Sequence, residues 1–423
     1  MKVAIIAHEI SPNQGSECAE GWNVVLNLAK YNDLELTVFC SLGPQLGADE
    51  YKKAITEYFK ENTPKSLKFK YIEYSKICKN IASINRFCFG RLSGIGLPIL
   101  YYICYRSWQS KVSKAIKYAN RKSKFDCIHL LNQITYRQPG KFYKIGIPFF
   151  WGPTGGSEIL PLSFIRSLPI RLRITEFMRL FITKILHVTL RSIHDAAKHS
   201  SVIYAFSNSD HDFFSNYALT KKMVDAATSI NNAEIRKLIP GRKLEILWAG
   251  QLTDRKLPFL VLDLMRRYPD LKDKVNFTIL GSGLRKISLT NAIKKSEFKN
   301  IKILDQIPHK EVEKIMLKSH FLLHTSYREA GTHIIPEALS SGLPVICHAI
   351  SGMDLTISRS NGFKVDLISY SYSIKKIASY LYQVIENPNL VFEKSSGAIS
   401  FSKINSWNNM AETFRQDYLN VKK

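Results

Sequence analysis

The order of apolar and polar positions along the chain predicts two series of alternating strands and helices. The first series opens with a continuous apolar run in Lys2–Ala7, which predicts a buried strand. A polar loop follows, then a segment with helical spacing over 16–28 and a second strand over 34–40. This strand–loop–helix–strand opening is typical of a doubly wound parallel sheet. Further strands of the first series are expected at 125–131, 147–151 and 202–206.

A polar, irregular stretch over 218–243 separates the two series and indicates a domain linker. The second series predicts strands at 244–248, 275–280, 301–303, 321–324 and 345–348 and helices at 258–267, 310–317 and 333–341. A chain of 423 residues is long enough for two domains. We expect the first domain to span 1–228 and the second 229–403.

Two segments of the first half are strongly basic. Residues 51–125 hold 17 Lys and Arg against 3 Glu, with Tyr101, Tyr105 and Trp108 among them. This pattern fits a solvated basic face, or a surface that lies on anionic lipid with its aromatic rings at the headgroups. The mostly helical segment 163–198 is a second candidate of this kind, and an ordinary basic helix packed on the first domain is its alternative.

Composition limits the class of protein. Hydrophobic residues make up 45% and charged residues 22%, which excludes a disordered or collagen-like chain. Sixty Lys and Arg against 35 Asp and Glu give a net charge of +25, so we expect an anionic partner. The seven cysteines include no CxxC pair and indicate reduced thiols in a cytosolic protein. No secretory signal is expected, and the uncharged stretches 92–105 and 338–353 are shorter than the about 20 residues of a membrane span.

The sharpest candidate site follows the strand expected at 321–324. The loop after it carries Glu329 and Gly331, and a helix is expected to begin near Thr332 and to carry Glu337. Ligands of open α/β sheets bind beyond the carboxyl ends of the strands, and free N–H groups at a helix start can bind phosphate. A carboxylate can accept from two neighbouring hydroxyls. The spacing therefore predicts a phosphate between two polyols, with two surface carboxylates on a βα unit as the alternative.

The same residues resemble a known family. Glu329 and Glu337 are separated by seven residues, and Glu337 opens the run EALSSGLPVI. This looks like the EX7E signature of retaining nucleotide-sugar glycosyltransferases of the GT-B fold, glycosyltransferase family 4. Other segments agree with the family in order: SPNQGSE at 11–17, WGPTGGSE at 151–158, WAGQLTDRK at 248–256 and LGSG at 280–283.

The resemblance implies an α/β chain of two Rossmann-like doubly wound domains facing a central cleft, with a C-terminal helix over 404–423 that crosses back to the first domain. It implies that Glu329 contacts the donor sugar, that Glu337 accepts from the ribose hydroxyls, and that Lys256 neutralises the leaving diphosphate. It further implies that five residues approach the donor through their backbone or a short side chain: Gly15, Ser16, Ala330, Gly331 and Thr332.

One position departs from the family pattern, and the first-domain side is less defined. Gln251 stands where the family usually has an arginine, and Arg255 is a possible substitute among the donor-binding residues. His129 is expected near the donor sugar as a catalytic residue, with Asn132 as its rival and a structural histidine as the alternative.

The acceptor side is expected around the second glycine-bearing loop of the first domain. Gly155, Gly156 and Glu158 are its candidate residues, with a loop or N-cap carboxylate as the alternative for Glu158. We assign His309 no role. The histidines of the second domain lack the spacing of a metal site, so no metal is expected.

The implied activity is transfer of a sugar from a nucleotide-diphospho-sugar, UDP- or GDP-linked, to a hydroxyl acceptor with retention and without a cofactor. The basic segment suggests a sugar or lipid-linked acceptor and a peripheral place on the inner face of the cytoplasmic membrane, in bacterial surface polysaccharide or glycolipid assembly. A non-catalytic or epimerase-type GT-B protein is the alternative. A nucleic-acid-binding protein is disfavoured, because no nucleic-acid motif appears and the basic excess lies away from the glycine-bearing loops.

Overall fold

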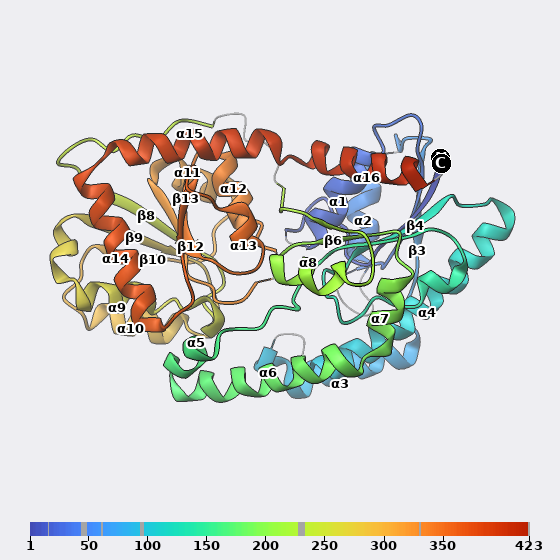
Figure 1. Cartoon of the computed structure of the whole chain (residues 1–423), viewed down its shortest axis with the longest axis horizontal. Helices are drawn as coiled ribbons and strands as arrows, with labels where there is room; N and C mark the ends of the chain where they lie inside the picture. Colours follow the sequence, from blue (N-terminus) through green and yellow to red (C-terminus); the bar gives the residue numbers. More distant parts are fainter. Residues whose placement is uncertain are drawn as a thin grey trace.

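The computed structural model describes residues 1–15, 17–43, 49–60, 62–93, 97–226, 233–329 and 331–421. These residues form two α/β domains, each built on a parallel sheet, which lie side by side along the long axis of the molecule (Figure 1). The expected fold class, two Rossmann-like doubly wound domains, is confirmed.

The first domain contains a seven-stranded sheet with the order β3-β2-β1-β4-β5-β6-β7. Its strands are β1 (Lys2–Ala7), β2 (Glu35–Cys40), β3 (Leu67–Tyr71), β4 (Cys127–Asn132), β5 (Phe149–Thr154), β6 (Val202–Ala205) and β7 (Thr220–Lys222). The order reverses between β1 and β4, which opens a crevice at the carboxyl ends of these strands. The two edge strands were not predicted, since β3 lies within the basic segment and β7 within the expected linker.

Helices cover both faces of this sheet. The helices of the domain are α1 (Glu17–Leu28), α2 (Glu50–Phe59), α3 (Lys76–Ser93), α4 (Pro98–Lys122), α7 (Arg191–Lys198), α8 (Asn208–Ser215) and the C-terminal α16 (Trp407–Val421). Trp22 of α1 and Phe414 of α16 share one apolar core with the sheet. Trp108 of α4 and Ile193 of α7 belong to a second core. The last helix of the chain therefore packs on the first domain, and α4 and α7 cover the opposite face (Figure 1).

The second domain contains a six-stranded sheet with the order β10-β9-β8-β11-β12-β13. Its strands are β8 (Leu244–Ala249), β9 (Val275–Leu280), β10 (Ile301–Leu304), β11 (Phe321–His324), β12 (Val345–His348) and β13 (Gly362–Val365). Its helices are α9 (Leu260–Arg267), α10 (Lys286–Lys294), α11 (His309–Lys318), α12 (Ile334–Ser340), α13 (Ser351–Thr356), α14 (Tyr370–Glu386) and α15 (Asn389–Ile404). The reversal of strand order falls between β8 and β11, where the candidate residues follow the strands.

The basic segment 163–198 forms three helices rather than one long one. Pro169 separates α5 (Leu162–Ser167) from α6 (Ile170–Thr189), and α7 follows. Although α5 precedes the expected boundary at 228, it packs into the core of the second domain, with the ring centroids of Phe164 and Tyr327 5.7 Å apart. A single boundary therefore does not describe the packing, because α5 belongs to the second domain by its contacts.

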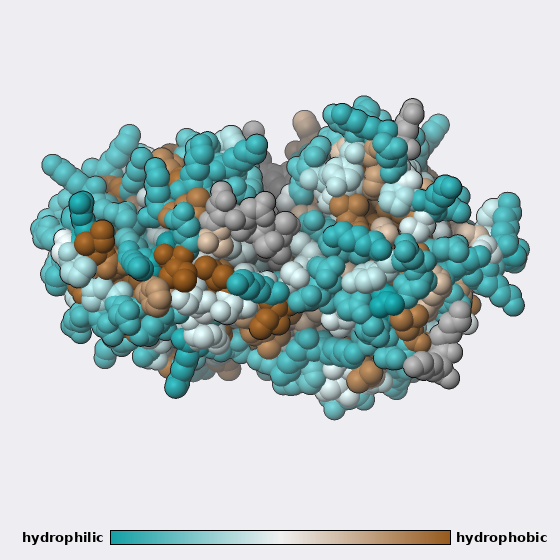
Figure 2. Space-filling view, turned by 90° about the horizontal axis from the view of Figure 1, so that it is seen from above, coloured by the Kyte–Doolittle hydropathy of each residue, from teal (hydrophilic) through white to brown (hydrophobic). Residues whose placement is uncertain are grey.

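The molecular surface is hydrophilic over most of the face seen from above, and its apolar patches there are small and separate (Figure 2). An indentation marks the junction of the two lobes in the same view. In the part of the chain that the structure describes, no helix is long and apolar enough to cross a membrane. The same residues include no group of three or more His, Cys, Asp or Glu side chains arranged to hold a metal ion.

Candidate functional site

Lys256 is held at the end of β8 by a tightly built loop. Strand β8 ends just before Gly250, and Lys256 closes the short 3-10 helix η2 (Asp254–Lys256). Gly250 has a φ of +152°, and a Cβ atom there would lie 3.1 Å from Lys256 Nζ. The backbone oxygen of Lys256 accepts a 2.6 Å hydrogen bond from Thr325 Oγ1, just beyond β11. The neighbouring strand end therefore fixes the loop, and the glycine leaves room for the ammonium.

The ammonium of Lys256 points at Glu329, which is surrounded by basic groups. Glu329 Oε1 lies 2.6 Å from Arg255 Nη1, 3.2 Å from Lys256 Nζ and 3.7 Å from His324 Nε2. Its side chain is only 9% exposed. Burial opposes ionisation of Glu329, but His324 and the charges of Lys256 and Arg255 outweigh it and hold its pKa well below the usual range. Burial lowers the pKa of Lys256, and Glu329 opposes that shift.

Glu337 lines a pocket of about 410 Å³ next to this cluster. Its apolar lining residues are Leu280, Ile307, Val312 and Ile334. Its polar lining residues include Gln251, His309 and Glu337. His309 Nε2 lies 3.4 Å from Glu337 Oε1, and this interaction raises the pKa of His309. The volume and the mixture of apolar walls with a few polar groups suit a small ligand.

Asp225, which precedes the expected domain boundary, occupies the loop expected to cradle the donor. The amide of Thr332 donates a 2.5 Å hydrogen bond to Asp225 Oδ2. A Cβ atom on Gly331 would lie 2.6 Å from the same oxygen, so only glycine leaves room for this carboxylate. Burial raises the pKa of Asp225. Ala330 lies outside the described residues. No pattern in the polar segment around Asp225 signalled this role.

The first loop of the first domain leads into the start of α1, which carries two further carboxyl groups. Gly15 is exposed with open space around it, and Ser16 lies outside the described residues. Burial, followed by the charge of Glu9, raises the pKa of Glu17 to about 8. Glu20 is fully buried, and burial followed by the charge of Asp225 raises its pKa well above the usual range. Sequence reasoning did not single out these acids, because α1 reads as an ordinary amphipathic helix.

His129 does not face the crevice, which corrects the expectation of a catalytic role. Its ring is fully buried beneath α16. Nδ1 lies 2.5 Å from Tyr418 Oη and Nε2 lies 2.5 Å from the carbonyl oxygen of Gly152, so both ring nitrogens have partners within the protein. Burial lowers the pKa of His129 to about 4. The structural alternative therefore holds for this residue.

Asn132, the rival of His129, is also buried. Its Nδ2 donates to the carbonyl oxygen of Glu9 at 2.6 Å, and its Oδ1 accepts from the amide of Glu9 at 3.1 Å. These bonds tie the end of β4 to the first loop. The amide group of Asn132 therefore bonds the backbone of Glu9 and is not directed at a ligand.

The acceptor-side candidates lie at the junction of the domains. Gly155 donates its amide to the carbonyl oxygen of Ile134 at 2.7 Å, and Gly156 has a φ of +93° with open space beside it. Glu158 Oε2 accepts a 2.5 Å hydrogen bond from Ser351 Oγ of the second domain. Its carboxylate bridges the two domains in this structure, and its place on the acceptor side stays a prediction.

Replacing Glu158 with glutamine is expected to flatten the dependence of the melting temperature on pH. Burial raises the pKa of Glu158 from its ordinary value of 4.5 to about 7. The folded state therefore binds more protons than the unfolded state between these values, and stability falls as pH rises through that window. When melting temperatures are measured from pH 4 to 8, the melting temperature of the variant should rise relative to that of the parent as pH rises. Glu57→Gln, on the exposed face of α2, is the control, and an equal gain there would contradict the assignment.

Comparison with known proteins finds a family match in the second domain and relatives that match part of the chain. Residues 230–397 match the family described as Glycosyl transferases group 1. A human component of phosphatidylinositol N-acetylglucosaminyltransferase is 30% identical over 115 residues, which are 26% of this chain and 23% of that protein. The GPI3 subunit of the transferase with the same name from Saccharomyces cerevisiae is 23% identical over 180 residues, 42% of this chain and 39% of its own. The chain thus matches less than half the length of these relatives.

Solved structures match nearly the whole chain. The lipopolysaccharide outer core galactosyltransferase WaaB in its apo form has a TM-score of 0.64 at 14% identity and is covered over 99% of both chains. Anabaena Alr3699/HepE in complex with UDP has a TM-score of 0.60 at 15% identity, with 99% of this chain and 100% of that chain covered. At such identities the likeness shows the fold alone. Residues 230–397 therefore form a domain of the glycosyl transferases group 1 type in a chain that has the GT-B fold.

Proposed function

We propose that the protein is a retaining glycosyltransferase of family 4, which transfers a sugar from a nucleotide-diphospho-sugar to a hydroxyl acceptor. The observation that carries the proposal is the meeting of Arg255, Lys256 and Glu329 beside the pocket that Glu337 lines. Glu337 would accept from the ribose hydroxyls, and the apolar lining residues of the pocket would contact the base. Glu329 would accept from hydroxyls of the donor sugar.

The proposed reaction exchanges one bond at the anomeric carbon of the donor sugar. The bond to the diphosphate oxygen breaks with its electron pair on the leaving diphosphate, and the acceptor oxygen bonds to the same face. A leaving phosphate oxygen takes the proton of the acceptor hydroxyl. Lys256 would stabilise the negative charge that develops on the diphosphate, so that catalysis consists mostly of positioning and electrostatic stabilisation.

We propose that Arg255 substitutes for the arginine that the family pattern has at position 251. Its Nη1 lies 2.6 Å from Glu329 Oε1 and donates to the carbonyl oxygen of Arg328 at 3.0 Å. Gln251 instead lines the pocket of Glu337. Two cations thus stand beside Glu329 without an arginine at position 251, which supports an active enzyme over a degenerate one.

The donor is proposed to be UDP-linked, with GDP-linked donors as the other class. The structural neighbour in complex with UDP supports this choice. Release of free nucleoside diphosphate from UDP- and GDP-sugars, measured with and without candidate acceptors, tests the proposal. Release that depends on an acceptor supports transfer. Binding of a nucleotide without any release would support the non-catalytic alternative, and absence of binding to every nucleotide would refute the proposal.

Replacing Asp225 with alanine is expected to tighten nucleoside diphosphate binding by about tenfold. The carboxylate accepts from the Thr332 amide where the donor phosphates are proposed to lie, so an anionic ligand must displace it. A hydrogen bond to a charged group contributes roughly 1.5 kcal/mol or more, which corresponds to about a factor of ten. Titration calorimetry with UDP measures the change. Weaker binding by the variant would show instead that Asp225 contacts the donor.

We propose a lipid-linked acceptor in glycolipid or surface polysaccharide assembly, reached from the inner face of the cytoplasmic membrane. Helix α6 carries exposed apolar side chains at helical spacing: Ile170, Ile174, Phe177, Met178, Phe181, Ile182 and Ile185. Exposed cations such as Arg171 and Lys184 accompany them. Helix α3 adds Ile77, Ile84 and Phe87, and both helices run along the lower edge of the molecule in Figure 1. An apolar stripe flanked by cations suits the interface of an anionic membrane.

The double variant Ile174→Glu, Phe181→Glu is expected to weaken vesicle binding by roughly tenfold. These side chains are 55% and 67% exposed, so the substitutions should leave folding intact. Partial burial of two such side chains contributes roughly 1.5 kcal/mol, or about a factor of ten. Flotation with anionic vesicles measures the change. The matched control is Ile239→Glu, Ile287→Glu in the second domain, at 64% and 77% exposure. Equal loss in both pairs would refute the assignment to α6, and equal recovery with neutral vesicles would remove its electrostatic part.

A further inference from the structure

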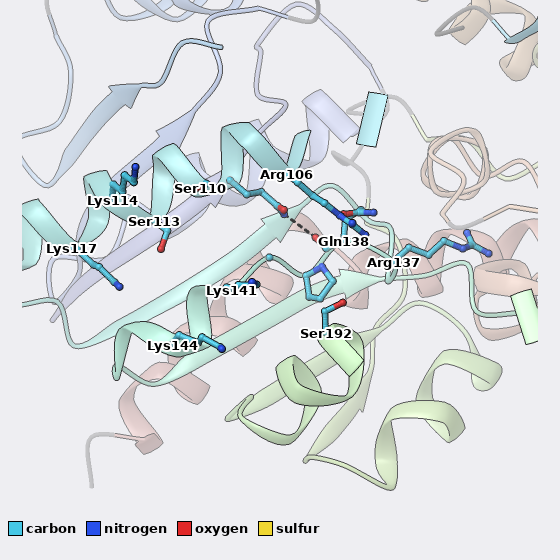
Figure 3. Close-up of a pocket in the computed structure, with 13 residues that line it drawn as sticks. Arg106, Ser110, Ser113, Lys114, Lys117, Arg137, Gln138, Lys141, Lys144 and Ser192 are labelled. Atoms are coloured by element: carbon cyan, nitrogen blue, oxygen red, sulfur yellow. Dashed lines mark hydrogen bonds between the residues drawn. The ribbon is translucent and has the colours of Figure 1, made fainter. Parts of the chain in front are cut away.

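A basic pocket of about 530 Å³ lies in the first domain, away from the residues proposed to hold the donor. Figure 3 shows it between α4, the loop before η1 (Phe142–Ile145) and the start of α7. Six cationic side chains line it: Arg106, Lys114, Lys117, Arg137, Lys141 and Lys144. No Asp or Glu is among its lining residues, all of which the structure describes. This hollow therefore concentrates positive charge without an internal counter-charge.

The six cationic side chains of this pocket differ from Arg255 and Lys256 in having no acidic partner among the described residues. Lys256 and Arg255 are paired with Glu329, whereas none of the six forms an ion pair within the described part of the chain. Like charges around one hollow repel one another, and a pocket with low-dielectric walls focuses their field. An anion bound there would remove this repulsion. Five of the six side chains are exposed, so the case for an anionic ligand rests on their gathering around one hollow with no acid among the lining residues.

Hydrogen bonds and close packing also hold several residues of the pocket in place. Gln138 is 7% exposed, and its Oε1 accepts a 2.7 Å hydrogen bond from Arg106 Nε. Gln109 is 4% exposed and donates to the carbonyl oxygen of Gln138 at 2.8 Å. Gly140 has a φ of +68°, and a Cβ atom there would lie 2.6 Å from the ring of the buried Phe142. These contacts fix both the loop and the guanidinium of Arg106.

The shape of the pocket indicates more than one anionic group. On α4 the lining positions run from Arg106 to Lys117 at spacings of three and four residues, which places them on one helix face over roughly 16 Å. Lys141 and Lys144 stand opposite, and Figure 3 shows Ser113 and Lys117 directed toward that side. Three serine hydroxyls, from Ser110, Ser113 and Ser192, lie among the cations and can bond sugar hydroxyls.

We propose that this pocket binds a phosphorylated sugar or polyol that carries two phosphate groups. The lysines and arginines would neutralise the phosphates, and the serine hydroxyls would bond the hydroxyls of the ring between them. The volume lies in the range of small-molecule sites. The ligand is either a soluble sugar bisphosphate or the headgroup of a phosphorylated lipid. That it is part of the acceptor rests on the proposed function, because the pocket lies in the acceptor-side domain.

Titration calorimetry with fructose 1,6-bisphosphate tests the soluble source, and flotation with phosphatidylcholine vesicles that contain phosphatidylinositol 4-phosphate tests the lipid source. The double variant Lys141→Glu, Lys144→Glu should lose at least about tenfold in affinity, since it removes two charge-assisted contacts. The matched control is Lys68→Glu, Lys70→Glu on the edge strand β3, which changes the net charge equally in the same domain. It should bind as the parent does.

The outcomes separate this site from the donor site. A response to only one probe supports the pocket and identifies the source of its ligand. Lys256→Met should retain binding of the bisphosphate, and Lys141→Glu, Lys144→Glu should retain binding of UDP. If UDP binds to no form of the protein, while binding of the bisphosphate still requires Lys141 and Lys144, the proposed function is refuted and the pocket proposal is supported. Equal losses in the pocket variant and its control, or no binding of either probe, would overturn the inference.

Discussion

Replacing Lys256 with methionine is expected to slow sugar transfer by roughly 10²- to 10³-fold, the usual cost of removing one group that stabilises developing charge. Methionine keeps the aliphatic stem and removes the ammonium, which lies 3.2 Å from Glu329. The leaving diphosphate gains negative charge as the bond to the sugar breaks. A cation fixed by the bond from Thr325 to the Lys256 carbonyl stabilises that charge without reorganising. The loss should therefore appear in the rate more than in binding.

Steady-state kinetics separate the two effects. We expect kcat to fall while KM for the donor changes within a few-fold, because the interaction strengthens only as the bond breaks. Lys274→Met is the matched control, since Lys274 pairs with Asp270 at 3.1 Å on the exposed surface of the same domain. A loss below about fivefold for Lys256→Met would assign stabilisation of the leaving group to Arg255 instead. A rise in KM alone would mean that Lys256 only binds the donor.

The second domain was the more predictable half of the molecule. Its apolar runs alternate with helical spacing, and the carboxyl ends of parallel strands meet at one edge of a sheet. The strand-end rule predicted a site at Glu329 after β11, and the family resemblance added Lys256 after β8; the two side chains lie 3.2 Å apart. The pattern did not reveal that His324 joins them, because a buried strand-end histidine resembles any other core position.

His129 shows where such reasoning fails. A histidine at the end of a strand could face the crevice or the core, and the strand pattern is the same in both cases. The contact that keeps His129 in the core comes from Tyr418, 289 residues further along the chain. Its hydroxyl lies against Nδ1 of His129 because α16 packs on the first domain. The C-terminal helix was expected to cross back, yet nothing local indicated which side chains it would cover.

Contacts between the domains were the least predictable part. Asp225 and Glu158, which precede the expected domain boundary, each bond a residue of the second domain, Thr332 and Ser351 respectively. These partners depend on how two finished domains sit against each other, and hydrophobic periodicity carries no information about that placement. The same reason explains α5, whose apolar face packs on the second domain although its sequence position assigns it to the first.

Replacing Glu337 with alanine is expected to weaken binding of the nucleoside diphosphate by about 10- to 100-fold. Loss of a hydrogen bond to a charged group costs roughly 1.5–3 kcal/mol, and a carboxylate that accepts from two ribose hydroxyls lies at the upper end. Glu337 is well placed for this role, because it lines the 410 Å³ pocket together with apolar side chains such as Leu280 and Ile307. The side chain is one-third exposed, so its removal should not unfold α12.

Thermal shift gives a direct readout of this change. Nucleotide at about 100 times its dissociation constant stabilises the parent by about 2.7 kcal/mol, whereas a hundredfold weaker site at the same concentration gains only about 0.4 kcal/mol. Glu313→Ala is the matched control. Glu313 lies 3.2 Å from Nδ1 of the same His309 that Glu337 meets through Nε2, but it does not line the pocket. If both variants lose the shift equally, the effect runs through the charge of His309 and not through a ribose contact. If only Glu337→Ala loses it, the carboxylate of Glu337 binds the nucleotide itself.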